Sequence, residues 1–262
     1  MKISLITVCF NAEKTIADTL RSVFAQRCPV PIEHLIVDGA SSDRTLAVVE
    51  GLLSVLQATN GNVIAHVISE PDRGMYDAIN KGAGLATGDL VGILNADDRF
   101  ADETSLATIA QAFVSQPSLE CVYGDVRFVR GDSDVTVRYY NSKRWRPWMH
   151  NWGFMPAHPT VYVRKSVFDR CGPYKLGYDI SADFEWMVRL FCRHRVQARY
   201  LPACLVTMRL GGKSTAGLKA MLKLNRENVR ANRENGYFCC LPMMAPKYFY
   251  KILGYLRKLP SR

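Results

Sequence analysis

Acidic side chains recur directly after short apolar runs in the first half of the chain. These acids are Asp38, Glu70, Asp72, Asp97 and Asp98. Carboxylates gathered at one place repel one another unless a cation lies among them, and oxygen ligands of this kind suit Mg²⁺ or Mn²⁺. Because Mg²⁺ usually takes only one or two protein carboxylates and completes its coordination with water and substrate phosphates, the pattern predicts a site for a metal and a phosphate group.

The segments that position these acids alternate between predicted strands and predicted helices. Short apolar runs predict strands over 3–8, 32–37, 63–68 and 90–94, and helical spacing of apolar residues predicts a helix after each. This order, with near-continuous apolar strands, is typical of a mostly parallel, doubly wound sheet. Ligands of such sheets bind beyond the carboxyl ends of the strands. We therefore expect the acids at one edge of the sheet.

The alternation ends near residue 120. Residues 121–129 and 135–140 predict two strands of a hairpin, and residues 184–191 predict a helix. Another acidic pair, Asp183 and Glu185, begins this helix. Positions two apart on a helix point to different faces, so these two acids should not share one role.

Each acid also has an ordinary structural explanation. Asp38 precedes a glycine and can shape a turn, and Asp97 and Asp98 can cap the next helix. For any one cluster alone this explanation is favoured, because short motifs often match by chance. Their joint occurrence after successive strands favours a functional site.

The composition is that of a globular protein with an excess of positive charge. The chain has 262 residues, of which 48% are hydrophobic and 22% charged, and a formal net charge of +10. This length can bury a core without disulfides, and the charge favours nucleic acid, acidic lipid or a phosphorylated substrate as partner. The acidic clusters and the lack of a recognition motif oppose nucleic acid. The eight cysteines form no C-x-x-C pair, which indicates a reducing compartment.

We expect the protein on the cytoplasmic side of the membrane. No segment has the roughly eighteen consecutive apolar residues that span a bilayer. The N-terminal apolar stretch is short and is interrupted by Asn11 and Glu13, which is not typical of a signal peptide.

Six segments, taken in order, resemble the family 2 glycosyltransferases, which have the GT-A fold. The resemblance is greatest to bacterial enzymes for exopolysaccharide, O-antigen and colanic-acid-type polysaccharides. The matching segments are 7–11 (TVCFN), 37–45 (VDGASSDRT), 69–82 (SEPDRGMYDAINKG), 86–89 (ATGD), 95–98 (NADD) and 181–185 (SADFE). Each is short, but the combination in this order is specific.

The resemblance implies an α/β fold of the GT-A (Rossmann-like) kind over residues 1–215, with a mostly parallel sheet flanked by helices. Residues 1–120 would bind the nucleotide sugar, and residues 121–215 would hold the acceptor and the catalytic group. Residues 216–262 would form a C-terminal helical region. Its tail, 246–260, has apolar side chains on one helical side among lysines and arginines. Such a helix can lie in a lipid interface or pack on its own domain.

The resemblance also assigns donor-binding residues. Thr7, Asn11 and Asp38 would line the nucleoside pocket, and Asp38 would accept a hydrogen bond from the base. Arg73 and Lys81 would lie near the donor diphosphate, where an arginine can make paired hydrogen bonds. For Lys81, an equally good explanation is that it is a helix residue whose side chain is simply solvated.

The segment 95–98 occupies the position of the family's D-x-D motif, with Asn95 in place of the first acid. Asp97 would bind Mg²⁺ or Mn²⁺ directly, and Asp98 would orient Asp97 or bind the metal through water. Asn95 would contact the sugar or the ribose. The substitution removes one formal charge from the metal site.

Asp183 matches the catalytic base of the family. An acceptor hydroxyl is a poor nucleophile at neutral pH, and a carboxylate within hydrogen-bond reach can take its proton as the new bond forms. A single displacement of this kind inverts the anomeric centre and needs no covalent intermediate. The segment 211–215 would close over the donor as a mobile loop or would be an ordinary surface turn.

Acceptor residues are expected in three places. His158 matches a family histidine near the acceptor or metal, although a lone histidine is more often structural. Trp145 and Trp148 belong to an aromatic and basic segment, 144–152, that can stack on sugar rings or pack on the core. Glu185 would lie on the acceptor side as the rival of Asp183.

These expectations describe a metal-dependent, inverting hexosyltransferase. It would move a sugar from a nucleoside-diphosphate-sugar to a polyprenyl-diphosphate-linked or other glycan acceptor in the synthesis of cell-surface polysaccharide such as lipopolysaccharide. It would be cytoplasmic and peripheral on the cytoplasmic face of the inner membrane. The alternative is a catalytically inactive nucleotide-sugar-binding scaffold or regulatory protein, against which Asp97 and Asp183 argue.

Overall fold

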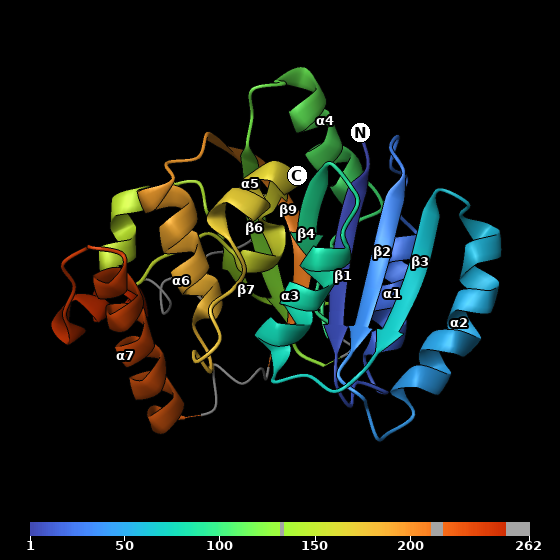
Figure 1. Ribbon diagram of the computed structural model, residues 1–262, viewed down its shortest axis with the longest axis horizontal. Coiled ribbons are helices and arrows are strands. Elements are labelled where there is room, and N and C mark those ends of the chain that lie inside the picture. The colour runs from blue at the N-terminus through green and yellow to red at the C-terminus, as the bar shows by residue number, and fades with distance from the viewer. Residues whose placement is uncertain (132–133, 211–216, 250–262) are drawn as a thin grey trace.

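The computed structural model, which describes residues 1–131, 134–210 and 217–249, is built around one sheet of nine strands (Figure 1). The strands are β1 (Ile3–Cys9), β2 (Ile32–Asp38), β3 (Val63–Ser69), β4 (Leu90–Ile93), β5 (Arg99–Phe100), β6 (Cys121–Val129), β7 (Thr136–Tyr140), β8 (Tyr162–Arg164) and β9 (Ala198–Arg209). Their order across the sheet is β3-β2-β1-β4-β8-β6-β9-β5, and β7 pairs with the second half of β6.

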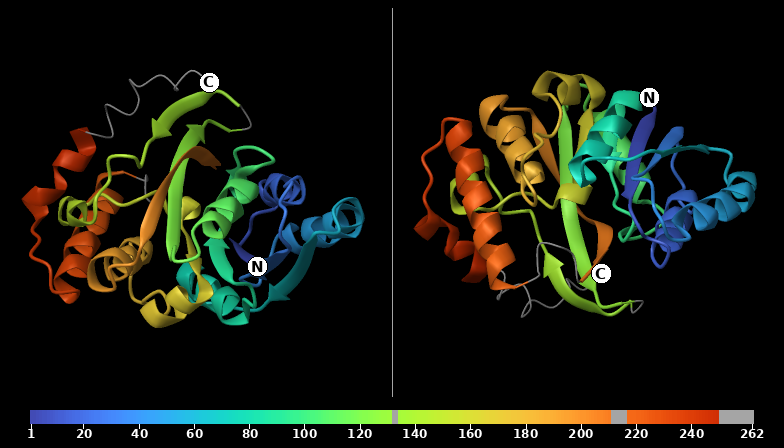
Figure 2. Two further views of the ribbon diagram at one scale, coloured as in Figure 1. Left: turned by 90° about the horizontal axis from the view of Figure 1, so that it is seen from above. Right: turned by 60° about the horizontal axis from the view of Figure 1, so that its bottom comes forward.

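Helices cover both faces of the sheet (Figures 1 and 2). They are α1 (Ile16–Phe24), α2 (Thr45–Thr59), α3 (Met75–Leu85), α4 (Ser105–Ser115), α5 (Lys165–Cys171), α6 (Ala182–Val188) and α7 (Leu218–Glu234), with the short turns η1 (Pro147–Trp152), η2 (His158–Thr160), η3 (Arg189–Arg193) and η5 (Leu241–Met244). One core contains α1, α2 and α4, and the other contains α3, α5 and α6. In β1, Ile3 and Leu5 face the first core while Ile6 and Val8 face the second, because side chains alternate along a strand.

The first four strands in the sheet order, β3, β2, β1 and β4, run parallel to one another. The predicted α/β architecture is therefore confirmed. Beyond β4 the sheet becomes mixed, because β8 runs antiparallel to both β4 and β6 while β9 runs parallel to β6. The carboxyl ends of β1, β2 and β3 lie at the lower edge of the sheet in Figure 1, and β4 ends at the same edge because it is parallel to β1.

The C-terminal region packs against the second half of the sheet domain. Helix α7 contacts α6 and η1, and η5 contacts both α7 and η1. None of the described helices has the length and apolar content needed to cross a membrane. The predicted loop 211–215 lies outside the described residues, as does most of the predicted tail 246–260.

The pairing of β4 with β8 leaves no room for a side chain at Gly92. A Cβ atom there would clash with the ring of Tyr162, which is fully buried. We expect Gly92→Ala to lower the free energy of unfolding by about 1–3 kcal/mol, the usual cost of overpacking, as measured by urea denaturation. Gly51→Ala is the control, because nothing lies within 4 Å of that position in α2. It should raise stability by up to about 1 kcal/mol, and an equal loss in both variants would contradict this packing.

Candidate active site

The loops that follow β1 and β2 are joined by the side chain of Asn11. This residue adopts a φ of +50°, a left-handed conformation that asparagine tolerates better than most residues. Its Oδ1 accepts hydrogen bonds from the backbone N–H of Ser42 at 2.9 Å and of Asp43 at 3.3 Å. Asn11 therefore lies at the predicted edge and shapes its loops, and its contact with a nucleoside stays a prediction.

Thr7 and Asp38 lie beneath this edge and are fully buried. The Thr7 hydroxyl lies 2.8 Å from Nε2 of His34. The Asp38 carboxylate accepts hydrogen bonds from the Ser41 N–H at 3.0 Å and the Ser69 hydroxyl at 2.7 Å. In this structure both side chains find their partners within the chain and support the loops, as buried polar groups do. Their place in a nucleoside pocket stays a prediction.

An exposed aromatic side chain, Phe10, is not among the predicted site residues. It is 63% exposed although it directly follows the buried strand β1. A Cβ atom at Gly39 would clash with the Asp72 carboxylate and would lie 3.4 Å from the Phe10 ring, so these three residues meet. An aromatic face beside a carboxylate suits a nucleobase, which can stack on the ring and donate N–H groups to the acid. The signal in the sequence is an aromatic residue placed just outside a buried strand.

Two basic side chains at the start of α3 and within it, Arg73 and Lys81, lie near the surface around Phe10 and Asp72. Arg73 is exposed and pairs with Asp77 at 3.1 Å. Lys81 Nζ lies 2.9 Å from Glu70 and donates a hydrogen bond to the Pro71 carbonyl at 2.7 Å. Both predicted diphosphate-binding residues are thus at the carboxyl edge. Each pair has one exposed partner, Arg73 or Glu70, so a diphosphate could compete with the carboxylates for these two cations.

The two carboxylates after β4 have different environments. Asp97 is exposed, whereas Asp98 is buried. Burial, and then the charge of Asp97, raise the pKa of Asp98 well above its usual range, and the positive charge of Arg209 at the end of β9 acts in the opposite direction. Among the described residues, Oδ2 of Asp98 and Oδ1 of Asn95 are buried without a hydrogen-bond partner.

These oxygens fit a divalent cation. The segment 95–98 provides one exposed carboxylate, one unpartnered carboxylate oxygen and one unpartnered amide oxygen, which is the kind of ligand that Mg²⁺ and Mn²⁺ prefer. Within residues 1–131, 134–210 and 217–249, no three His, Cys, Asp or Glu side chains converge as a metal-binding group. A cation here would therefore depend on further ligands from the substrate or water.

Asp183 begins α6 and is half-buried. Its Oδ1 accepts a hydrogen bond from the Phe184 N–H at 2.8 Å and lies 3.3 Å from the Tyr76 hydroxyl, which also donates to the Ile180 carbonyl at 2.6 Å. Burial raises the pKa of Asp183, while the neighbouring His158 and these hydrogen bonds oppose the rise. A carboxylate with a raised pKa is a stronger proton acceptor than an ordinary aspartate.

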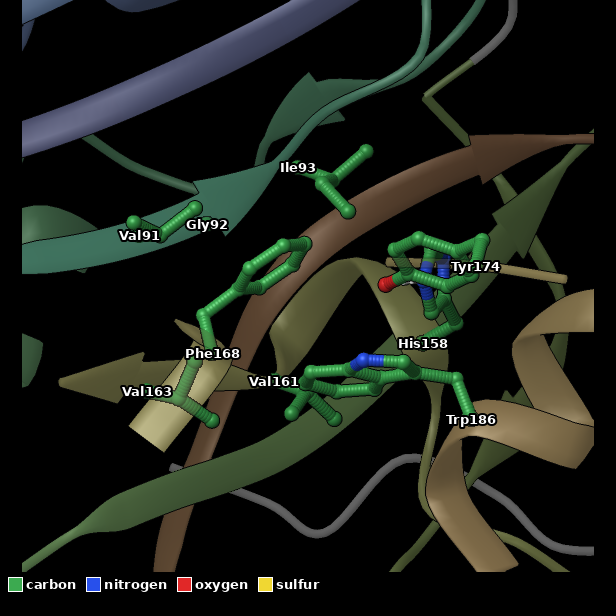
Figure 3. A pocket seen from close by; sticks show the side chains of 9 residues that line it. All are labelled: Val91, Gly92, Ile93, His158, Val161, Val163, Phe168, Tyr174 and Trp186. Atoms are coloured by element: carbon green, nitrogen blue, oxygen red, sulfur yellow. Dashed lines mark hydrogen bonds between the residues drawn. The ribbon is translucent and has the colours of Figure 1, made fainter. Parts of the chain in front are cut away.

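Three aromatic rings stack behind the start of α6. Tyr174 lies between Tyr76 and Trp186, with ring centroids 5.9 and 5.2 Å away. The Tyr174 hydroxyl lies 2.9 Å from Nε2 of His158. Both residues line a cavity of about 10 Å³ together with Ile93, the last residue of β4 (Figure 3), which is about the space of one water molecule. His158 thus connects the start of α6 with the carboxyl end of β4.

Helix α7 fixes the turn that precedes Asp183. The buried carboxylate of Glu227 accepts hydrogen bonds from three successive backbone N–H groups. The donors, at 3.1, 3.0 and 2.9 Å, are Asp179, Ile180 and Ser181. Hydrogen bonds to a charged acceptor are the strong ones, so the position of Asp183 depends on a residue from the far end of the chain. No local pattern in the sequence indicates this contact.

The sequence profile described as Glycosyl transferase family 2 matches residues 4–176. The chain belongs to glycosyltransferase family 2. A PGL/p-HBAD biosynthesis glycosyltransferase of Mycobacterium bovis is 28% identical over 203 residues, which are 76% of this chain and 73% of that protein. The family predicted from the six sequence segments is therefore confirmed.

Solved structures of other glycosyltransferases have the same fold. Residues 1–349 of S. aureus TarS, in complex with UDP-GlcNAc, align with a TM-score of 0.66 at 17% identity, over 94% of this chain and 71% of that one. The mannosyltransferase PcManGT from Pyrobaculum calidifontis, in complex with GDP-Man and Mn²⁺, aligns with a TM-score of 0.63 at 17% identity, over 93% and 67%. At this identity the likeness shows the fold alone, and it confirms the predicted GT-A fold. The chain spans only 65% of the chain in another structure of S. aureus TarS 1–349.

Two predicted acceptor residues of this glycosyltransferase are core residues. Trp145 is only 5% exposed, and its ring packs edge-on against Phe191 with centroids 4.7 Å apart. Glu185 is fully buried and pairs with Arg189 at 2.9 Å and Lys175 at 3.0 Å. For Trp145 this is the alternative of packing on the core, and a contact of either side chain with an acceptor stays a prediction. Glu185 lies two positions after the predicted base and therefore points to another face of α6.

Trp148 is exposed, as an acceptor residue would be, but it lies far from the predicted base. It shares a pocket with Cys192, nine positions after Asp183 on the continuous segment α6–η3. At about 1.5 Å of rise per residue, these positions are about 13 Å apart along the axis. The contact of Trp148 with an acceptor stays a prediction, at a place remote from the predicted base. The contact of His158 with acceptor or metal stays a prediction.

The hydrogen bond from Tyr76 should set the pH dependence of the glycosyltransferase. A carboxylate can act as a base only when it is ionised, so with Asp183 as the predicted base activity would be lost as pH falls through its pKa, which burial places above the ordinary value of about 3.9. Tyr76→Phe removes a bond that lowers this pKa. We expect the acid limb of the kcat/KM profile to move to higher pH and kcat to fall about tenfold, equivalent to about 1.4 kcal/mol.

Tyr178→Phe is the matched control for this variant. Its hydroxyl bonds Glu234 of α7 at 2.9 Å, away from the predicted base, so the acid limb should not move. An acid limb that stays in place in Tyr76→Phe would show that this hydroxyl does not tune the base.

Proposed function

We propose that this family 2 enzyme is a metal-dependent, inverting hexosyltransferase. It would take one sugar from a nucleoside-diphosphate-sugar and attach it to a polyprenyl-diphosphate-linked glycan in cell-surface polysaccharide synthesis. The observation that carries the proposal is that Asp183 neighbours His158, which lines one small cavity with Ile93, the last residue of β4 and two positions before the segment 95–98. A donor held at segment 95–98 would turn its anomeric carbon toward Asp183.

The reaction needs one base. The acceptor hydroxyl gives its proton to Asp183 while its oxygen bonds to the anomeric carbon, and the bond from that carbon to the diphosphate breaks. The electron pair of the broken bond leaves with the diphosphate. One displacement of this kind inverts the anomeric centre. The raised pKa of Asp183 supports its assignment as the proton acceptor.

Asp97 would hold Mg²⁺ or Mn²⁺, with the open oxygens of Asn95 and Asp98 beside it. The cation, when bound, offsets the negative charge that grows on the departing diphosphate. Arg73 and Lys81 add positive charge at the same edge, and the surface around Phe10 would receive the base.

The donor class is supported by the ligands of two relatives of the same fold. S. aureus TarS binds UDP-GlcNAc, and PcManGT binds GDP-Man with Mn²⁺. Because these donors carry different bases and sugars, we propose only a nucleoside-diphosphate-sugar for this chain. The formal charge of +10 favours an acceptor at an anionic membrane surface, with the protein peripheral on the cytoplasmic face of the inner membrane.

Removing the base should stop transfer without releasing the donor. We expect Asp183→Asn to lower kcat by about 10²- to 10⁴-fold, measured as nucleoside diphosphate release with acceptor present, while the dissociation constant of the donor stays within about twofold. Asp179→Asn is the control, because this nearby carboxylate is exposed and pairs with Lys223. Full turnover in Asp183→Asn would contradict the assignment. Loss of turnover in both variants would point to a general effect on the turn.

Metal and donor should bind together at Asp97. A thermal-shift screen of UDP-, GDP- and dTDP-sugars should find one donor that raises the melting temperature more with Mn²⁺ than without it, because a ligand of the folded state stabilises it. Asp97→Asn should remove this Mn²⁺-dependent increment, whereas Asp169→Asn, on an exposed face of α5, should keep it. An increment that survives in Asp97→Asn would contradict the metal assignment.

A further inference from the structure

An aromatic and basic surface lies at the end of α6–η3 remote from Asp183. Three segments meet there: η1, residues 189–196, and the stretch 237–241 after α7. They are joined by contacts of Cys192 Sγ with the carbonyl of Pro147 at 3.6 Å and of Cys239 Sγ with the carbonyl of Asn151 at 3.2 Å. A pocket of about 380 Å³ opens between them, and its lining includes Trp148, Phe191, Arg195 and Tyr237. We term this region the Trp148 surface.

Large apolar side chains are exposed on the segments that form this pocket. Trp148, which lines it, is 64% exposed, and Phe238 and Leu241, which follow the lining residue Tyr237 along the chain, are 76% and 47% exposed. Single exposed apolar residues are common, but several on segments that meet at one place mark an interaction site. We therefore expect the Trp148 surface to bind an apolar partner.

The same surface carries an excess of positive charge. Its segments 147–152, 189–196 and 237–241 contain no Asp or Glu, and their Lys and Arg residues are Arg189, Arg193 and Arg195. Arg189 is neutralised by Glu185, but none of the ion pairs among the described residues involves Arg193 or Arg195. The partner should therefore be anionic as well as apolar.

We propose that the Trp148 surface docks on an anionic phospholipid bilayer. Trp148 and Phe238 would enter the boundary between headgroups and acyl chains, where aromatic side chains are enriched, and Arg195 would meet a lipid phosphate. A nucleic acid would satisfy the charge but would leave Phe238 and Leu241 in water. A bilayer supplies the negative charge and the apolar phase together.

This docking proposal rests on the proposed function, because membrane contact would bring the enzyme to a lipid-linked acceptor. It puts Asp183 about 13 Å along α6–η3 from the bilayer side. The reacting hydroxyl of a lipid-linked glycan is likewise separated from the bilayer by the diphosphate and the inner sugars. The carboxyl edge of the sheet stays open to a soluble donor.

Vesicle binding tests the docking without donor or metal. The full chain is mixed with phosphatidylcholine vesicles that contain or lack phosphatidylglycerol, and sedimentation and tryptophan emission are recorded. Trp145 and Trp186 are buried, so a change in emission reports chiefly on Trp148 and the less exposed Trp152. We expect a blue shift and co-sedimentation with the anionic vesicles, both reduced by salt. Equal binding to the neutral vesicles, or none to either, would overturn the proposal.

Two variants locate the contact. Trp148→Ala should lose most of the blue shift. The double variant Arg193→Gln/Arg195→Gln should lower partition about 25-fold, at about fivefold for each charge near the surface. The control Arg21→Gln/Arg27→Gln makes the same charge change at exposed positions on and after α1. Equal partition of the two double variants would overturn the assignment of this surface.

Two further measurements distinguish a failure of the docking proposal from a failure of the proposed function. The melting temperature of each variant shows that it is folded. Donor binding with Mn²⁺, measured without vesicles, shows whether the proposed function stands. Intact donor binding with no vesicle binding refutes only the docking surface, whereas vesicle binding without donor binding refutes the proposed function.

Discussion

Crowding of negative charge at the carboxyl end of β4 is the constraint on which the rest of the site depends. Asp98 is buried next to Asp97, and both burial and that neighbouring charge raise the pKa of Asp98. One of its oxygens is left without a hydrogen bond in the described part of the chain. A buried charge of this kind is costly unless it is paired. A divalent cation with a phosphate ligand relieves this cost, and for that reason we place the donor there.

The predicted base is held by elements that are far apart in sequence. Tyr76 of α3 forms a hydrogen bond with Asp183, and His158 of η2 lies near it. Glu227 of α7 accepts hydrogen bonds from the turn that precedes Asp183. Residues after 215, which the sequence patterns separate from the GT-A domain, thus position a residue inside it. A movement of α7 would displace Asp183, because the charge-assisted hydrogen bonds of Glu227 connect α7 to the turn before Asp183.

The sequence was sufficient to predict the family, the parallel strands and the edge where they end. Apolar runs followed directly by acids, such as β4 and Asp97, are local patterns that tertiary contacts rarely override. Side-chain environments could not be predicted in this way. Trp145 and Glu185 lie in segments that read as functional, yet both are buried, Trp145 against Phe191 and Glu185 beside Arg189. The contact of Glu227 with the turn before Asp183 and the antiparallel strand β8 depend on long-range pairing, which no local pattern encodes.

The most direct test of the account is a crystal structure of the chain with its donor and Mn²⁺, in which anomalous scattering locates the metal. We expect one manganese peak in direct contact with an Asp97 oxygen and with the donor diphosphate, and an anomeric carbon that faces Asp183 across an open path for the acceptor. A manganese peak on other carboxylates, or a donor whose anomeric carbon faces away from Asp183, would contradict it.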